Sequence, residues 1–393
     1  MVNNLTERQN RESYASLSII SNFEIMLKNT LVNGALMAFG VFFALCAFDI
    51  AVYLSPKEIL PKALLNLVQQ MEMNSGSNYL NHPELGHTIK PGTDFVFTGE
   101  EFTFKLQTRL NYPDAGFRGG TLGGPVWGAA FGDSFTFGAG VDQTETWVGQ
   151  LAKLTNREII NFGVPAYGPH QYTRIFQKYG APLRPKIIFY TLYTNDLEDA
   201  QRFENRGKSD QSFNRNFSIK RFLKNYSASN NLFRNLIHSF AAKRRDNTWG
   251  GIGLKLLDRK LRNPYGIPDG EFESTWAAVA KQIDAAVEES KRINATFVLL
   301  YFPSKEEVYW QLAKEQVKPI KDFEERIERL SKTTQNFCRV RQLLCLDLSS
   351  ALRDRGINGE KLYFPIDIHW NERGHLAVAQ EIFKFLRDKN LIN

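Results

Sequence analysis

Hydrophobic residues are most concentrated over residues 31–54, which follow about thirty polar residues of mixed charge. This apolar run is long enough to cross a bilayer, which takes about 20 predominantly apolar residues. Its polar members, Asn33 and Asp49, lie near its ends, within reach of the membrane interfaces. We therefore expect one transmembrane helix over 31–54. A buried hydrophobic helix is the alternative, and the long polar leader makes a cleaved signal peptide a poorer fit.

Charged residues near this run indicate its orientation. Lys and Arg are sparse on both sides of it, so the positive-inside rule favours a cytoplasmic tail over residues 1–30 only slightly. The rest of the chain is then expected outside the cytoplasm, as part of a single-pass membrane protein.

Residues 55–114 are expected to form a linker and a β-hairpin. The pattern from 55 to about 81 is mixed and amphipathic, as in a juxtamembrane helix and linker. Two short alternating segments follow, 95–97 and 102–106, separated by Gly99 and Glu100. Alternation with a period of two on both sides of a turn predicts a hairpin.

Beyond residue 115, apolar strand-like runs alternate with helical patterns. The strand-like runs are 126–131, 158–162, 186–192, 296–302 and 343–346, and the helical patterns are 145–154, 170–179, 271–292, 318–338 and 371–387. Strands that alternate with helices of this length imply right-handed crossovers and a parallel sheet covered on both faces. We expect residues 115–393 to be an α/β domain, a three-layer αβα sandwich around a five-stranded parallel sheet.

The alternation is interrupted by an insertion between about residues 200 and 270. This insertion is basic and polar, with apolar residues such as Phe222, Phe233 and Leu256 among its many Lys and Arg. Because it leaves the sheet directly after a strand end, it should overhang the edge where open α/β sheets bind ligands. It could form a lid or a groove for an anionic substrate, or a solvated helical insertion whose charges keep it soluble.

Composition narrows the expected partners. The chain is 43% hydrophobic and 23% charged, which is ordinary for a folded protein. Its net charge of +7 would suit a polyanion or an anionic membrane surface. It lacks zinc-finger spacing, a basic zipper and a single-strand-binding aromatic signature, so we expect no nucleic-acid partner.

The cysteine and histidine residues limit which metal sites and disulfides the chain can form. Cys46 lies in the apolar run, whereas Cys338 and Cys345 could form a disulfide in an oxidising compartment or remain two buried thiols. No pair among the six His residues has convincing metal-ligand spacing. We expect neither a metal nor a cofactor.

The candidate chemistry begins at Gly132-Asp133-Ser134, where the first apolar strand ends. An apolar run that stops at a glycine and gives way to a helical pattern predicts a strand that turns sharply into the next element. Such a turn presents the serine hydroxyl at the carboxyl edge of the sheet, where open α/β sheets bind ligands. Ser134 is the candidate nucleophile, and we expect Asp133 to stabilise the turn.

A serine nucleophile also needs hydrogen-bond donors for the oxyanion. Gly163 follows the second strand, and a backbone N–H there could approach a substrate oxygen without a Cβ in the way. Asn195 follows the third strand, and its amide can be a second donor, although it could instead only cap a turn.

The candidate base is His369, in the loop before the last helical pattern, with Asp367 two residues upstream. A histidine with a nearby carboxylate is suited to act as a general base with an orienting partner. Asn371 is the expected N-cap of the last helix. We expect Trp370 to be a packing residue and His375 to be a structural or surface residue.

Gly132-Asp133-Ser134, Gly163, Asn195 and His369 resemble the four blocks of the SGNH/GDSL hydrolases, which carry Ser, Gly, Asn and His in this order. The resemblance covers roughly 115–386 apart from the insertion, and residues 115–119 and 301–309 are similar to bacterial membrane-anchored members. Many members have Asp-x-x-His in the last block. The shorter spacing here is similar to the Asp-x-His pair of the alginate O-acetylation proteins, although their pair precedes the serine. The resemblance implies a flavodoxin-like fold.

The resemblance also implies a role for each site residue. Ser134 would attack an ester carbonyl, His369 would transfer the proton, and Asp367 would fix the imidazole tautomer. The oxyanion donors would be the N–H groups of Ser134 and Gly163 and the side chain of Asn195. The expected function is that of a membrane-anchored serine esterase with a periplasmic or otherwise extracytoplasmic catalytic domain.

Its expected substrates are O-acyl esters, such as acetyl esters, of a carbohydrate or cell-envelope polymer. Two alternatives stay open at this point. One is a polysaccharide O-acyltransferase with the same triad, and the other is a non-catalytic, membrane-tethered protein for glycan binding or assembly. The sequence indicates no particular protein partner or oligomeric state.

Overall fold

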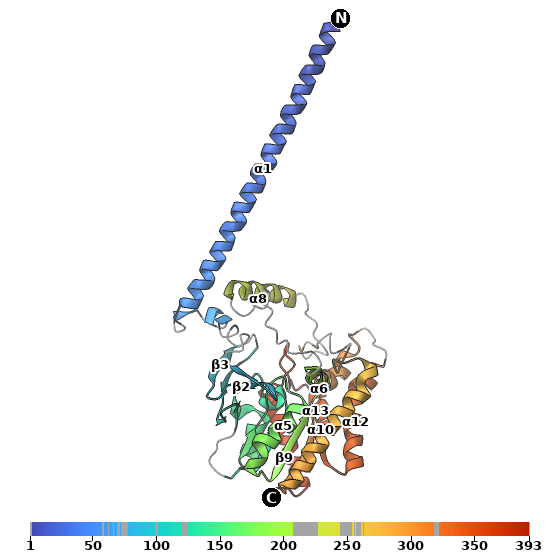
Figure 1. Ribbon diagram of the computed structural model, residues 1–393. Helices are drawn as coiled ribbons and strands as arrows, with labels where there is room; N and C mark the ends of the chain where they lie inside the picture. The colour runs from blue at the N-terminus through green and yellow to red at the C-terminus, as the bar shows by residue number, and fades with distance from the viewer. Residues whose placement is uncertain are drawn as a thin grey trace.

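A computed structural model describes the chain over residues 2–392, except for 57–58, 62, 66, 69–70, 72–77, 99–100, 120–124, 207–226, 244–253, 255, 257–260, 262 and 318–321. A long N-terminal helix projects from an α/β domain (Figure 1). The turn expected at Gly99 and Glu100 and most of the basic insertion lie outside the described residues.

The N-terminal helix, α1, runs without a break over Val2–Leu54. It therefore includes both the polar leader and the apolar run. Its segment Lys28–Leu54 is long and apolar enough to cross a membrane, and only 6% of the apolar window is buried. This exposure is unlike that of a core helix, whereas a membrane span and an N-terminal signal sequence both fit the length and composition.

The expected five-stranded parallel sheet is confirmed. It consists of β7 (Gly128–Phe131), β8 (Ile159–Asn161), β9 (Ile187–Leu192), β10 (Thr296–Tyr301) and β11 (Leu344–Asp347). Its order is β11-β10-β9-β7-β8, and every neighbouring pair is parallel. Counted along the chain this is the order 2-1-3-4-5, which is flavodoxin-like, with the switch point between β7 and β9.

Helices cover both faces of this sheet. Residues of α5 (Pro169–Ile175) and α10 (Phe272–Arg292) share one core cluster with alternate strand residues such as Phe131 and Tyr190. The opposite face packs against α4 (Trp147–Thr155), α11 (Lys305–Ala313), α13 (Ser349–Ile357) and α14 (Glu372–Asp388). The helix α12 (Phe323–Arg341) contributes to both clusters beside β11. The three-layer αβα sandwich is thus confirmed.

A second, antiparallel sheet precedes the sandwich, and the sequence pattern did not reveal it. Its order is β1-β2-β6-β5, and its strands are β1 (Tyr79–His82), β2 (Gly86–Ile89), β5 (Leu110–Asn111) and β6 (Gly116–Phe117). The expected hairpin is present as β3 (Asp94–Thr98) and β4 (Thr103–Gln107). Because β6 pairs with both β2 and β5, the domain boundary expected at residue 115 falls within one sheet.

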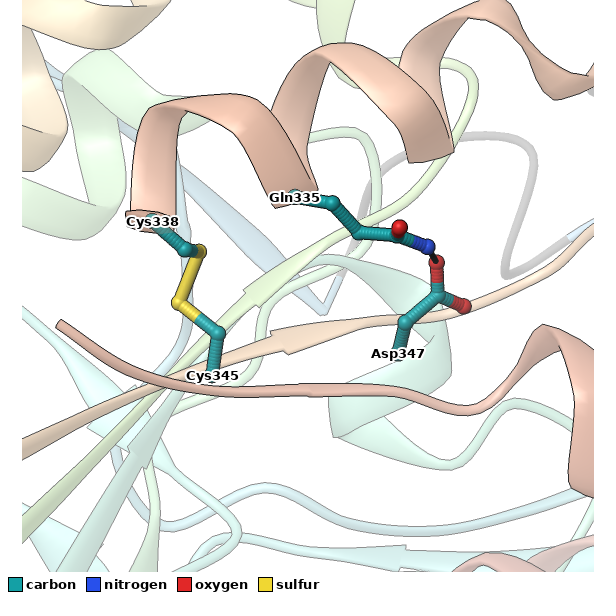
Figure 2. The surroundings of a disulfide bond; sticks show 4 residues. All are labelled: Gln335, Cys338, Cys345 and Asp347. Carbon is teal, nitrogen blue, oxygen red and sulfur yellow. Dashed lines mark hydrogen bonds between the residues drawn. A yellow bond between two sulfur atoms is a disulfide. The ribbon is translucent and has the colours of Figure 1, made fainter. Parts of the chain in front are cut away.

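Cys338 and Cys345 form a disulfide, which decides between the two states that the sequence left open. The bond joins α12 to the edge strand β11, as Figure 2 shows. Gln335 lies one turn earlier in α12 and donates a hydrogen bond of 2.6 Å from its side-chain amide to Asp347, at the end of β11. The last strand is thereby fastened to the helix that precedes it.

His375 is a structural residue, which decides between the structural and surface roles expected for it. It is buried in α14, and its Nδ1 accepts the backbone N–H of Trp147 at 3.2 Å, which joins α14 to α4. Burial, with a smaller effect from the charge of Arg118, lowers the pKa of His375 to about 3 from 6.5. The imidazole is therefore neutral in the folded protein at ordinary pH.

We predict that His375→Asn flattens the pH dependence of stability between about pH 6.5 and pH 3. In the native chain the depressed folded pKa means that only the unfolded state takes up a proton in this window. Stability is therefore present above the unfolded pKa and is lost as the pH falls. Urea unfolding of both chains at several pH values measures the effect, and equal slopes for the two would contradict it.

Candidate active site

Ser134 stands on a tightly packed turn at the carboxyl end of β7. The strand ends at Phe131, and the short helix α3 begins at Ser134 and ends at Phe137. Asp133 caps this helix, because its Oδ1 accepts the N–H of Phe135 at 2.9 Å. A Cβ on Gly132 would lie 2.0 Å from Oγ1 of Thr191, so only glycine fits there. The expected turn, with Asp133 as its stabilising acid, is confirmed.

The structure brings Ser134, His369 and Asp367 into one hydrogen-bonded chain. Nε2 of His369 lies 2.7 Å from Oγ of Ser134, and Nδ1 lies 2.6 Å from Oδ1 of Asp367. The same carboxylate oxygen accepts the backbone N–H of His369 at 2.9 Å. These contacts assign the proton of a neutral imidazole to Nδ1, which leaves Nε2 as an acceptor for the serine hydroxyl.

The pKa values of the two acids beside the serine are shifted in opposite directions. Burial raises the pKa of Asp367, but the hydrogen bonds and charge of His369, together with the charge of Lys305, outweigh it and hold that pKa below its usual value. For Asp133 burial dominates, and its pKa lies above the usual value. Asp367 is therefore the carboxylate suited to stabilise a positive charge on the imidazole.

The loop that carries His369 is fixed by its own contacts. The backbone N–H of Phe364 donates to the carbonyl of His369 at 3.1 Å, which closes the loop. Trp370 is fully buried, with its ring 4.9 Å from that of Phe135 next to the serine. Asn371 caps α14 by accepting the N–H of Gly374 at 3.1 Å. The expected packing role of Trp370 and the expected cap at Asn371 are both confirmed.

A buried lysine and a glutamate from the hairpin hold the Asp367 side of this loop. Lys305 is fully buried, and its Nζ donates to three loop carbonyls, those of Phe364, Pro365 and Asp367, at 2.7, 2.9 and 3.1 Å. Glu101 lies between β3 and β4, and its carboxylate accepts the N–H groups of Ile366 and Asp367 at 2.8 and 2.6 Å. We refer to Lys305 and Glu101 together as the loop clamp.

Burial lowers the pKa of Lys305 to about 8, although the charges of Glu306, Glu101 and Asp367 oppose this shift. The loop clamp was not expected from the sequence. Nothing in the local pattern marks Glu101, and Lys305 stands out only as part of the segment 301–309. Only the folded chain brings Glu101, 266 positions before Asp367, to the site.

Two of the three expected oxyanion donors, Gly163 and Asn195, follow the carboxyl ends of β8 and β9, and both already have partners. The N–H of Gly163 donates to Oδ1 of Asn161 at 2.9 Å, and Nδ2 of Asn195 donates to Asp199 at 3.0 Å. A Cβ on Gly163 would lie 2.2 Å from the backbone nitrogen of Phe137. The glycine is therefore required for packing against α3, a reason that the sequence did not disclose.

Arg118 supports the serine helix from its other end. Its buried guanidinium donates to the carbonyls of Phe137 and Gly138 at 2.7 and 2.9 Å, and to that of Val141 at 2.9 Å. A longer bond of 3.2 Å reaches the carbonyl of Lys105 in β4. Arg118 thus ties α3 to the hairpin and was not among the expected site residues.

The site is reachable from solvent, since the side chains of His369 and Asp367 are 16% and 34% exposed. A serine hydroxyl bonded to an imidazole, itself bonded to an ionised carboxylate, can attack an acyl carbon and transfer protons. Among the residues that the structure describes, no group of three or more His, Cys, Asp or Glu could hold a metal ion.

The strand order and the serine turn at the switch point define an open α/β domain of the flavodoxin-like type. The chain belongs to the GDSL-like lipase/acylhydrolase family, whose model matches residues 130–377. The match extends from β7 into α14 and so includes the serine turn and the histidine loop. Membership in this family makes the protein an ester hydrolase by class.

Solved structures similar to this chain come from the same family and from acetylxylan esterases. A G-D-S-L family protein from Desulfitobacterium hafniense is 13% identical, with 66% of this chain and 99% of that one covered and a TM-score of 0.39. A member of the lipolytic protein G-D-S-L family from Veillonella parvula is also 13% identical, with 66% of this chain and 97% of that one covered and a TM-score of 0.38. An acetylxylan esterase from Geobacillus stearothermophilus is 10% identical, with 67% of this chain and 95% of that one covered and a TM-score of 0.36. A comparison with curated proteins finds no match.

We predict that Glu101→Ala lowers the kcat of ester hydrolysis on the order of tenfold and leaves KM nearly unchanged. Hydrogen bonds to a charged group contribute about 1.5 to 3 kcal/mol. Losing two of them should loosen the Asp367 loop without touching the substrate. Hydrolysis of p-nitrophenyl acetate measures the effect. Asp94→Ala removes an exposed carboxylate from the same hairpin and serves as the control, and equal rates for the two variants would contradict the prediction.

Proposed function

We propose that this protein is a serine esterase with Ser134, His369 and Asp367 as its catalytic triad. The observation that supports the proposal is the unbroken chain of two hydrogen bonds, 2.7 and 2.6 Å long, from the serine hydroxyl to the aspartate. A turn packed as tightly as that at Gly132 holds the nucleophile in place before any substrate arrives.

In this mechanism Oγ of Ser134 attacks the ester carbonyl while Nε2 of His369 takes its proton. The imidazolium then gives that proton to the leaving alkoxide, and an acyl-enzyme remains. Water, activated by the same nitrogen, releases the acid and restores the serine. Asp367 stays ionised throughout, because its lowered pKa favours the carboxylate, and it keeps the Nδ1 proton of His369 in place.

The oxyanion would be stabilised by the backbone N–H groups of Ser134 and Gly163 and by the side-chain amide of Asn195. These groups follow the carboxyl ends of β7, β8 and β9, which are adjacent strands of the sheet. The bonds from Gly163 to Asn161 and from Asn195 to Asp199 would be exchanged for bonds to the substrate oxygen. The added strength of a bond to a developing negative charge favours that exchange.

We place the catalytic domain outside the cytoplasm, anchored by a single transmembrane span over 31–54 with residues 1–30 on the cytoplasmic side. The apolar, exposed segment of α1 supports the anchor. The disulfide between Cys338 and Cys345 supports an oxidising compartment. Esters found there include O-acyl groups on carbohydrates and cell-envelope polymers, and we propose acetyl esters of such a polymer as substrates.

We predict that Ser134→Ala reduces acetate release from an O-acetylated polysaccharide by at least about 10⁴-fold, because no other group forms the acyl-enzyme. Binding of a fluorophosphonate probe should be lost with it. Unchanged hydrolysis in the variant would overturn the proposal. A native protein that the probe fails to label would indicate a binding or assembly protein, and acetyl transfer to a sugar in place of acetate release would indicate an acyltransferase.

We predict that Asn195→Ala lowers kcat by about 10² to 10³, the usual cost of removing one oxyanion donor. The same residue could instead act only by capping the turn between β9 and α6 (Asp196–Arg206). Thermal unfolding separates the two roles. A large fall in kcat with a small change in melting temperature supports the donor role, whereas a lower melting temperature with normal kcat contradicts it.

A further inference from the structure

The helix α8 (Ala228–Lys243) from the basic insertion is attached to the apolar helix α1. The carboxylate of Asp49 in α1 accepts the backbone N–H of Ser229 at 2.7 Å and its hydroxyl at 3.1 Å. A carboxylate at a helix N-terminus satisfies free N–H groups and complements the helix dipole. This contact accounts for an acid that the sequence otherwise leaves inside an apolar run.

Apolar packing reinforces the attachment. Val52, Met71 and Ala228 form a small buried cluster of their own, with Phe48 among the residues packed against it. The first turn of α8 is therefore seated on the last turns of α1. Figure 1 shows α8 beside the C-terminal end of α1 and running across its direction, on the side of the α/β domain from which α1 projects.

The position of Asp49 determines the depth of α8 relative to a bilayer. The apolar segment Lys28–Leu54 has 27 residues, which corresponds to about 40 Å of helix at 1.5 Å per residue. A hydrocarbon core of about 30 Å leaves roughly 10 Å for the two interfaces. Asp49 lies five residues before Leu54, about 7.5 Å along the axis. With the segment centred in the bilayer, Asp49 is about 2.5 Å inside the boundary between hydrocarbon and headgroups.

Among the described residues of α8, three large apolar side chains are exposed on one face. Leu232, Phe233 and Leu236 are 45, 62 and 51% exposed, and residues three and four apart share one side of a helix. Arg234, on the other side of the helix, is half-buried. Large apolar side chains gathered at the end of an apolar helix are typical of a surface that contacts lipid.

We propose that α8 is a membrane-surface helix, with Leu232, Phe233 and Leu236 inserted at the boundary between headgroups and acyl chains. The inference rests on the membrane anchoring proposed above for α1. The domain would then have two membrane attachments, the transmembrane span and the interfacial helix. Together they would restrict the rotation of the catalytic domain about its anchor. The insertion would then serve to orient the domain on the bilayer.

The test places nitroxide labels on the full-length chain in vesicles of phosphatidylethanolamine and phosphatidylglycerol. The background variant Cys46→Ser removes the free thiol and leaves the disulfide intact. Labels at Phe233→Cys and Leu236→Cys should be several-fold more accessible to oxygen than to a water-soluble nickel chelate. The lipid control is Phe42→Cys in α1. The water control is Ile357→Cys, an exposed position in α13 that should show the reverse order.

Each other outcome overturns the proposal. Accessibility to nickel at Phe233 equal to that at Ile357 would place the face in water, and low accessibility to both reagents would mean that a protein covers it. Nickel access at Phe42 would remove the membrane anchor on which the inference rests. Ester hydrolysis by the same labelled chains reports separately on the active site, so a failure here is distinguishable from a failure of the proposed function.

Discussion

The packing of the turn between β7 and α3 is the constraint on which the rest of the site depends. Neither Gly132 nor Gly163 has room for a Cβ, because side-chain and backbone atoms of neighbouring elements lie within 2.2 Å of where it would be. Arg118 binds the carbonyls at the far end of α3. The helix is therefore held at both ends, and the hydroxyl of Ser134 has little freedom to leave the position in which His369 meets it.

The histidine side of the site is built differently, because the loop that carries His369 is held in place by residues from other elements. Lys305 binds its carbonyls and Glu101 binds its N–H groups, so two opposite charges bind the backbone of the same short segment. Glu101 belongs to the hairpin that precedes the sandwich. The hairpin is therefore part of the active-site framework, and a chain cut at residue 115 would lose one half of the loop clamp.

The sequence predicted those strands and site residues that are marked by a pattern of neighbouring residues. The five strands are continuous apolar runs, and Ser134 and His369 each lie in a short pattern next to a strand or a helix. It missed Arg118, Glu101 and Lys305 as site residues, because their partners are distant in the chain and a charged residue in a loop ordinarily indicates solvent. For the same reason the sequence did not decide between a disulfide and two free thiols, since spacing alone does not give the distance between Cys338 and Cys345. The helices α11 and α13 are short and were not separated from the loops around them.

The strand directions connect the site with the proposed bilayer contact. The carboxyl end of β9 leads into α6, and Figure 1 places α6 on the side of the domain nearest α8. Ser134 follows the carboxyl end of β7, the parallel neighbour of β9, and so belongs to this same edge. If α8 lies on the membrane surface as proposed, the edge that carries Ser134 would face the bilayer. Esters on polymers held close to the membrane would then lie nearer to Ser134 than esters free in solution, so the proposed placement of α8 and the proposed polymer substrate support each other.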